Sequence, residues 1–127
     1  MYEETRREIL FKQILDASFA VHTELGPGLL ESAYEQCLFY ELCCRRIKVE
    51  KQKGMPLLYH EVKMELGYRL DLLVGDEIIV EIKAVEALNG VHLAQLLTYL
   101  KISGCKLGLL INFNVRHLKD GIRRVIR

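Results

Sequence analysis

Apolar and polar positions alternate most regularly between Tyr68 and Lys83, where the chain reads YRLDLLVGDEIIVEIK. Apolar side chains occupy every second position on both sides of Gly75-Asp76, and a period of two is typical of strands with one buried face. They are Leu70, Leu72 and Val74 before the glycine, then Ile78, Val80 and Ile82 after it. This stretch therefore predicts a β-hairpin.

The length of the turn decides which residues of the hairpin face each other. With a two-residue turn of Gly75 and Asp76, Asp71 and Glu81 would point to different faces. A three-residue turn that includes Glu77 puts the alternating apolar residues on one face and places Asp71 opposite Glu81, with Cβ atoms about 5 Å apart. The pairs are then Leu70 with Ile82, Leu72 with Val80, Val74 with Ile78, Arg69 with Lys83 and Leu73 with Ile79. We predict this second register because it separates apolar from polar residues.

Two facing carboxylates on a partly buried strand repel each other unless a cation lies between them. Mg²⁺ is a suitable cation, because it takes oxygen ligands from one or two carboxylates and fills its other positions with water and phosphate. Lys83 follows Glu81 on the same face, where an ammonium group can orient a water or stabilise charge on a phosphate. The alternative is a cross-strand ion network on a solvated face, and the spacing alone favours neither.

Apolar residues spaced three or four apart predict three helices. The first begins at a capping box of Thr5 and Glu8 and ends at Gly26-Pro27. The second covers about residues 30–45, and the third runs from Asn89-Gly90 to about residue 102. In the third helix, apolar residues are expected to cover most of one side: Val91, Leu93, Leu96, Leu97 and Leu100.

Several polar residues on these helices have both a structural and a functional interpretation. Glu31, in the first turn of the second helix, is explained by the helix dipole, or else it points to the hairpin as a third oxygen donor. His92, Gln95 and Tyr99 share one side of the third helix, which is either an ordinary polar face or a face directed at the strand ends. His22 lies in the first helix, and we expect it to be a packing or surface histidine and not a ligand.

The remaining strands are less regular. Residues 47–52 and 57–64 predict a first strand and a ragged hairpin around Gly54-Met55-Pro56 and Tyr59-His60. The apolar run from Lys106 to Phe113 predicts a strand buried on both faces, which completes a strand, helix, strand unit. The tail from His117 to Arg127 predicts a short amphipathic element against the sheet. The fold class is therefore α/β with a mixed sheet.

Composition and length set limits on the class of protein. The 127 residues fit one domain covering 1–127, and half of them are hydrophobic. We expect a cytoplasmic protein without a membrane segment, because no leader or apolar span is visible. The net charge of +1 does not indicate nucleic-acid binding, yet basic residues cluster in two places. Each cluster is either a set of phosphate contacts or an ordinary solvated face. The clusters are Arg45, Arg46, Lys48, Lys51 and Lys53, and Arg116, Lys119, Arg123, Arg124 and Arg127.

With these residues in view, the chain resembles the GxxExxY proteins, a group in the PD-(D/E)xK nuclease-like superfamily. Gly28, Glu31 and Tyr34 form the naming motif. The resemblance runs from about residue 9 to the end, through HTELGPGLLESAYE, YRLDLLV, VEIKAVEAL, HLAQLLTYL and GLLINFNV. It implies a restriction-endonuclease-like αβββαβ core in which helices flank a central four-stranded sheet.

The resemblance also implies chemistry at named positions. The superfamily signature falls on Asp71, Glu81 and Lys83, and the RecB-like branch adds a helix-borne acid and a Gln-x-x-x-Tyr helix. The implied metal ligands are Glu31, Asp71, Glu81 and the Ile82 carbonyl; the implied catalytic residues are Asp71, Glu81, Lys83, Gln95 and Tyr99.

These residues lead us to expect a Mg²⁺- or Mn²⁺-dependent nuclease that acts on nucleic acid, DNA rather than RNA. Relatives with an iron–sulfur cluster carry three cysteines after the Gln-x-x-x-Tyr helix, whereas only Cys105 follows it here, so we expect no cluster. The alternative function is a non-catalytic nucleic-acid-binding or assembly module with the same fold. A structural subunit that forms a homodimer is a weaker third interpretation.

Overall fold

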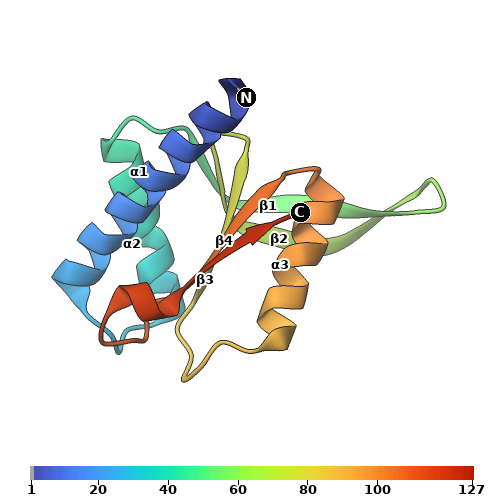
Figure 1. Cartoon of the computed structure of the whole chain (residues 1–127). Coiled ribbons are helices and arrows are strands. Elements are labelled where there is room, and N and C mark those ends of the chain that lie inside the picture. Colours follow the sequence, from blue (N-terminus) through green and yellow to red (C-terminus); the bar gives the residue numbers. More distant parts are fainter. Residues whose placement is uncertain (1) are drawn as a thin grey trace.

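One mixed sheet of five strands organises the molecule (Figure 1). The computed structural model describes residues 2–127, and the side chains of 5–65 and 67–127. The strands are β1 (Val49–Tyr59), β2 (Val62–Val74), β3 (Ile78–Lys83), β4 (Leu107–Asn112) and β5 (Ile122–Ile126), adjacent in that order. The β3–β4 pair is parallel and the other pairs are antiparallel.

Helices cover both faces of this sheet. Helices α1 (Tyr2–Leu25) and α2 (Glu31–Cys44) lie together on one side and α3 (Gly90–Ser103) on the other (Figure 1). Two apolar layers result, one beneath α1 and α2 and one beneath α3. The order of two helices, three strands, a helix and a strand confirms the predicted α/β class and the restriction-endonuclease-like arrangement.

The sheet has one strand more than the four expected. The tail forms a short 3-10 helix (Leu118–Gly121) and then β5, which pairs antiparallel with β4. Every residue of β4 is buried, so its outer backbone groups need a partner that water cannot supply. The tail was predicted to lie against the sheet as an amphipathic element; it instead joins the sheet as its edge strand.

The helix boundaries agree with the predicted ones at most ends. Asn89 caps α3, accepting from Val91 N and His92 N, and Gly104 ends it in the left-handed region. The capping box predicted at Thr5 is wrong, because α1 already begins at Tyr2. The apolar face predicted for α3 is also too broad, since Val91 and Leu97 are exposed.

Strands β1 and β2 form a long hairpin that extends away from the helices (Figure 1). Its turn is at His60 and Glu61, both with positive φ, next to the predicted Tyr59-His60 turn. The predicted break at Gly54-Met55-Pro56 lies inside β1, where the register shifts between Met55 and Leu57. A proline is tolerated there because β1 is an edge strand and the shift forms a bulge.

The connection between α1 and α2 depends on a buried tyrosine. Tyr34 Oη donates to Gly26 O at 2.6 Å and accepts from Leu29 N at 3.1 Å, and its ring stacks on Phe113 at 4.7 Å. Gly28 has φ 101°, which a side chain rarely adopts. Two residues of the GxxExxY motif, Gly28 and Tyr34, therefore hold this connection in place. His22 is buried and bonds Val115 O at 2.8 Å, as expected for a packing histidine.

Candidate metal centre at the open end of a hairpin

The turn end of the β2–β3 hairpin has the predicted register. Leu72 pairs with Val80, Leu73 with Ile79 and Val74 with Ile78. These pairs require a turn of three residues, in which Gly75 and Asp76 both have φ 59°. The three-residue turn is therefore confirmed.

The other end of the hairpin is open, because the β2–β3 ladder stops at Leu72 and Val80. Leu72 packs beneath α1 and α2, but Leu70 packs in the α3 layer with Ile79 and Tyr99. The prediction that Leu70 shares a face with Leu72 is wrong. The alternation holds only while β2 stays paired with β3, and it reverses where the two strands part.

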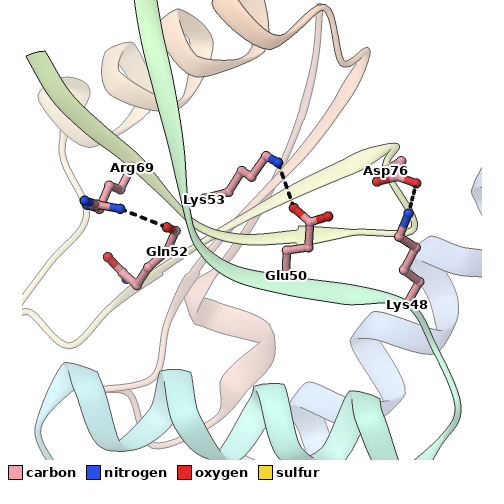
Figure 2. Close-up of polar contacts among 6 residues, drawn as sticks. All are labelled: Lys48, Glu50, Gln52, Lys53, Arg69 and Asp76. Atoms are coloured by element: carbon pink, nitrogen blue, oxygen red, sulfur yellow. Dashed lines mark hydrogen bonds and ion pairs between the residues drawn. The ribbon is translucent and has the colours of Figure 1, made fainter. Parts of the chain in front are cut away.

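A kink in the long hairpin accompanies this separation. The β1–β2 register places Gln52 opposite Asp71, between the pairs Lys51–Leu72 and Lys53–Leu70. Gln52 has φ 52°, a strained conformation for a residue within a strand. Arg69 Nη1 donates to the Gln52 carbonyl at 3.3 Å and so helps to hold the kink (Figure 2).

Carboxylates take over the hydrogen bonds of the missing ladder. Asp71 N donates to Glu81 Oε2 at 2.8 Å, and Ile82 N donates to Asp71 Oδ2 at 2.8 Å. Each side chain thus accepts the amide that a strand carbonyl would otherwise accept. Asp71 and Glu81 are neighbours, as predicted, and backbone amides hold both carboxyl groups at the open end of the hairpin.

Burial and mutual repulsion change the protonation of this pair. Burial, and to a smaller extent the charge of nearby Glu35, raise the pKa of Asp71 to about 6 against the lowering effect of the bond from Ile82 N. Burial, followed by the charge of Asp71, raises the pKa of Glu81 to about 8. Lys83 lowers both pKa values, but less than burial raises them. At neutral pH the pair therefore retains a proton, as carboxyl groups do where positive charge is lacking.

Lys83 links this pair to α3. Its Nζ donates to Gln95 Oε1 at 3.3 Å, and Gln95 Nε2 donates to Tyr99 Oη at 3.3 Å. Burial and the charges of Glu81 and Asp71 raise the pKa of the Tyr99 hydroxyl. Gln95 and Tyr99 therefore face the strand ends as predicted, whereas His92 bonds the backbone amide of Asn89 at the helix cap.

The acidic residue that α2 brings to the pair is Glu35, one turn after Glu31. Glu35 raises the pKa of both Asp71 and Glu81, and Gln52 Nε2 donates to its two carboxylate oxygens at 3.0 and 2.9 Å. Glu31 is exposed in the first turn of α2, and no interaction within the described residues links it to the pair. Sequence reasoning missed Glu35, although helical spacing places it one residue beyond the buried Tyr34.

The donor set suits a hard divalent cation bound partly by water. Among the described side chains, no three His, Cys, Asp or Glu converge as a ready-made metal cage. Mg²⁺ requires fewer, since one or two carboxylates with water and phosphate suffice. Asp71 and Glu81 each offer one oxygen, and the Ile82 carbonyl faces the same gap because a strand residue directs its N–H and C=O to one side.

Comparison with known protein families gives a match over most of the chain. Residues 8–125 match the family model described as the PD-(D/E)XK nuclease superfamily, which covers nearly the whole chain. No curated protein and no solved structure shows a significant match. None of the helices in the described part of the chain is long and apolar enough to cross a bilayer.

Proposed function

Because this chain belongs to the PD-(D/E)XK nuclease superfamily, we propose that it is a Mg²⁺- or Mn²⁺-dependent nuclease that hydrolyses phosphodiester bonds. The observation that carries the proposal is the buried pair Asp71 and Glu81, which retains a proton beside Lys83. A site that lacks positive charge in this way favours a divalent cation and the phosphate that accompanies it. We propose DNA rather than RNA as substrate because of the resemblance to the GxxExxY and RecB-like proteins.

The metal would be held by Asp71, Glu81 and the Ile82 carbonyl. When bound, a divalent cation supplies charge neutralisation at the phosphate and a water that is easier to deprotonate. Glu35 is the third carboxylate, in the role expected for Glu31, and Gln52 orients it by donating to both of its oxygens. Gln52 therefore acts as a positioning residue.

The residues on the α3 side would act on the substrate. Lys83 is placed to hold the attacking water or to stabilise charge on the phosphate, and the bond to Gln95 orients its ammonium group. Tyr99 Oη accepts from Gln95 Nε2, so its own proton can be donated to a phosphate oxygen. Gln95 joins these two groups in one hydrogen-bonded row.

The decisive experiment is a cleavage assay with Mg²⁺ or Mn²⁺ on single- and double-stranded DNA and RNA. We expect metal-dependent cleavage that EDTA stops. Lys83→Ala should slow cleavage about 10²- to 10³-fold while metal binding measured by calorimetry stays nearly intact. Confirmed metal binding with no cleavage of any of the four substrates would contradict the proposal.

A non-catalytic nucleic-acid-binding module is the second candidate. One observation favours it: Asp71 and Glu81 already satisfy the backbone amides of the open strand end, which is a structural role in itself. Salt-dependent DNA binding that survives alanine at Asp71, Glu81 and Lys83, without turnover, would select this function. A homodimeric structural subunit would show itself by sedimentation as a dimer that binds no nucleic acid.

A further inference from the structure

A hollow of about 480 Å³ lies on the α1 side of the molecule, away from the carboxylate pair. Three segments form it: the end of α1, the α1–α2 connection and the segment between β4 and β5. In Figure 1 the connection and the 3-10 helix lie side by side at the lower left. Its polar lining includes Thr23, Arg116, His117 and Lys119, and no acidic residue lines it.

The two strong cations of this hollow differ from the first basic cluster. Among the side chains of residues 5–65 and 67–127, none forms an ion pair or hydrogen bond with the side chain of Arg116 or Lys119. Most of the first cluster is occupied. Lys48 pairs with Asp76 and Lys53 with Glu50 (Figure 2). Arg45 pairs with Glu41, and Lys51 lies over the Phe39 ring. Positive charge is therefore available in the hollow and largely neutralised along β1.

Buried side chains hold the walls of the hollow in place. His22 ties α1 to Val115 O at 2.8 Å, just before Arg116. Tyr34 ties the connection through Gly26 O and stacks on Phe113, the residue that follows β4. Leu118, between the cationic residues, is 2% exposed. A ligand entering the hollow therefore meets walls already ordered, which lowers the entropy cost of binding.

The hollow and the carboxylate pair are connected through the same end of the sheet. Asn112, the last residue of β4, pairs with Lys83, and Arg116 follows it by four residues. The Asn112 side chain bonds both Val85 N and Val85 O, which fixes the segment after β3 to the segment after β4. On the other wall, Tyr34 directly precedes Glu35 in α2.

We propose that this hollow binds a backbone phosphate of the nucleic-acid substrate, outside the cleavage centre. The proposal rests on the proposed nuclease function for the identity of the strand. Arg116 and Lys119 supply the charge, and Thr23 and the His117 ring supply hydrogen-bonding groups at the same surface. The contact is with phosphate alone, so it contributes affinity and register without sequence preference.

The test is nucleic-acid binding in EDTA, where no cleavage occurs, by fluorescence anisotropy of a labelled single-stranded oligonucleotide at several salt concentrations. Arg116→Ala/Lys119→Ala should weaken binding on the order of tenfold at 0.1 M salt. Because one phosphate of a single strand is no longer neutralised, the salt slope should also fall by about 0.7.

The matched control is Lys12→Ala/Lys106→Ala, which removes two exposed positive charges elsewhere on the surface. It should leave the affinity and the salt slope within about twofold of the wild-type values, because general attraction between exposed charges is screened. Equal losses in both double variants, or none in the Arg116 and Lys119 variant, would overturn the proposal. Urea unfolding of each variant verifies that the hollow itself remains folded.

Free inorganic phosphate presents the same oxygen atoms and negative charge to the hollow as a backbone phosphate does. Inorganic phosphate titrated into the protein, followed by the NMR shifts of Gly26 and His117, should compete with the oligonucleotide. If phosphate shifts these residues while the double variant binds the oligonucleotide like wild type, the hollow takes free phosphate and the proposal fails. Failure of cleavage leaves this assay unaffected, so the proposed function and the hollow are tested separately.

Discussion

The two ends of the β2–β3 hairpin are built from similar residues but satisfy their backbone in different ways. At the turn end, the strands form an ordinary antiparallel ladder, in which residues 72–74 pair with residues 78–80. At the open end, the carboxylates of Asp71 and Glu81 accept the amides instead. The strongly raised pKa values belong to the carboxyl groups of the open end.

The difference separates stability from chemistry within one hairpin. A ladder of backbone hydrogen bonds between apolar residues satisfies the strands completely, so nothing remains to bind a ligand. The open end replaces carbonyl acceptors by side chains, which satisfies the amides and also brings two carboxyl groups together. The charge that remains there costs stability and creates an affinity for cations.

The largest expected effect comes from Asp71→Asn, which removes a charge at the open end. Cleavage should fall on the order of 10³-fold, because charge stabilisation at the phosphate is lost. The metal-free protein should melt slightly higher, since repulsion with Glu81 is relieved and an amide oxygen can still accept from Ile82 N. The matched control is Asp76→Asn at the turn end, whose ion pair with Lys48 is exposed, so both activity and melting should change little. A lower melting temperature for Asp71→Asn without metal would mean that the carboxylates form a structural ion network.

Ile78→Ala should have the opposite profile at the turn end. Ile78 is completely buried beneath α1 and α2, so the substitution should lower the free energy of unfolding by about 2–5 kcal/mol. Cleavage per folded molecule should remain near wild type. Urea denaturation and single-turnover kinetics on the same samples measure the two quantities. A large loss of activity in fully folded Ile78→Ala would show that the two ends are coupled.

The open end should make stability depend on pH. A carboxyl whose folded pKa is raised adds stability below its unfolded pKa, and that contribution is lost as the pH rises through the folded pKa. In the folded protein the pKa is about 6 for Asp71 and about 8 for Glu81, compared with ordinary values of 3.8 and 4.5. The metal-free protein should therefore lose stability as the pH rises from about 4 to 9. Urea unfolding in EDTA across that range measures the loss, and saturating Mn²⁺ should reduce it. A profile that Asp71→Asn leaves unchanged would assign the pH dependence to other groups.

The smallest effect distinguishes two glutamates on α2. Glu35→Gln should weaken metal-dependent cleavage about 10- to 100-fold, the usual loss for a group that supports a metal site. Glu31→Gln removes the same charge one turn earlier and should have almost no effect on kcat/KM. Comparing kcat/KM for the two variants decides which acid serves the open end. The reverse order of effects would restore the role predicted for Glu31.

The candidate site was predictable from the sequence wherever it depended on local periodicity. The turn length followed from the alternation around Gly75, which also made Asp71 and Glu81 neighbours, and helical spacing directed Gln95 and Tyr99 to the same side. Glu35 was not predictable in this way, because Glu31 and Glu35 are one turn apart and lie on the same face of the helix. The choice depends on Gln52, a residue of another strand.

The sequence by itself determined the α/β class, the bounds of α2 and α3, the register at the turn end and the identity of the facing carboxylates. These features depend on interactions between residues close in the chain, which periodicity and capping residues report directly. Tertiary structure alone decided the fifth strand, the kink at Gln52 and the layer in which Leu70 packs. Each of these depends on how β1, β2 and β4 satisfy backbone groups across the sheet, and such pairing over long separations leaves no periodic signal in the sequence.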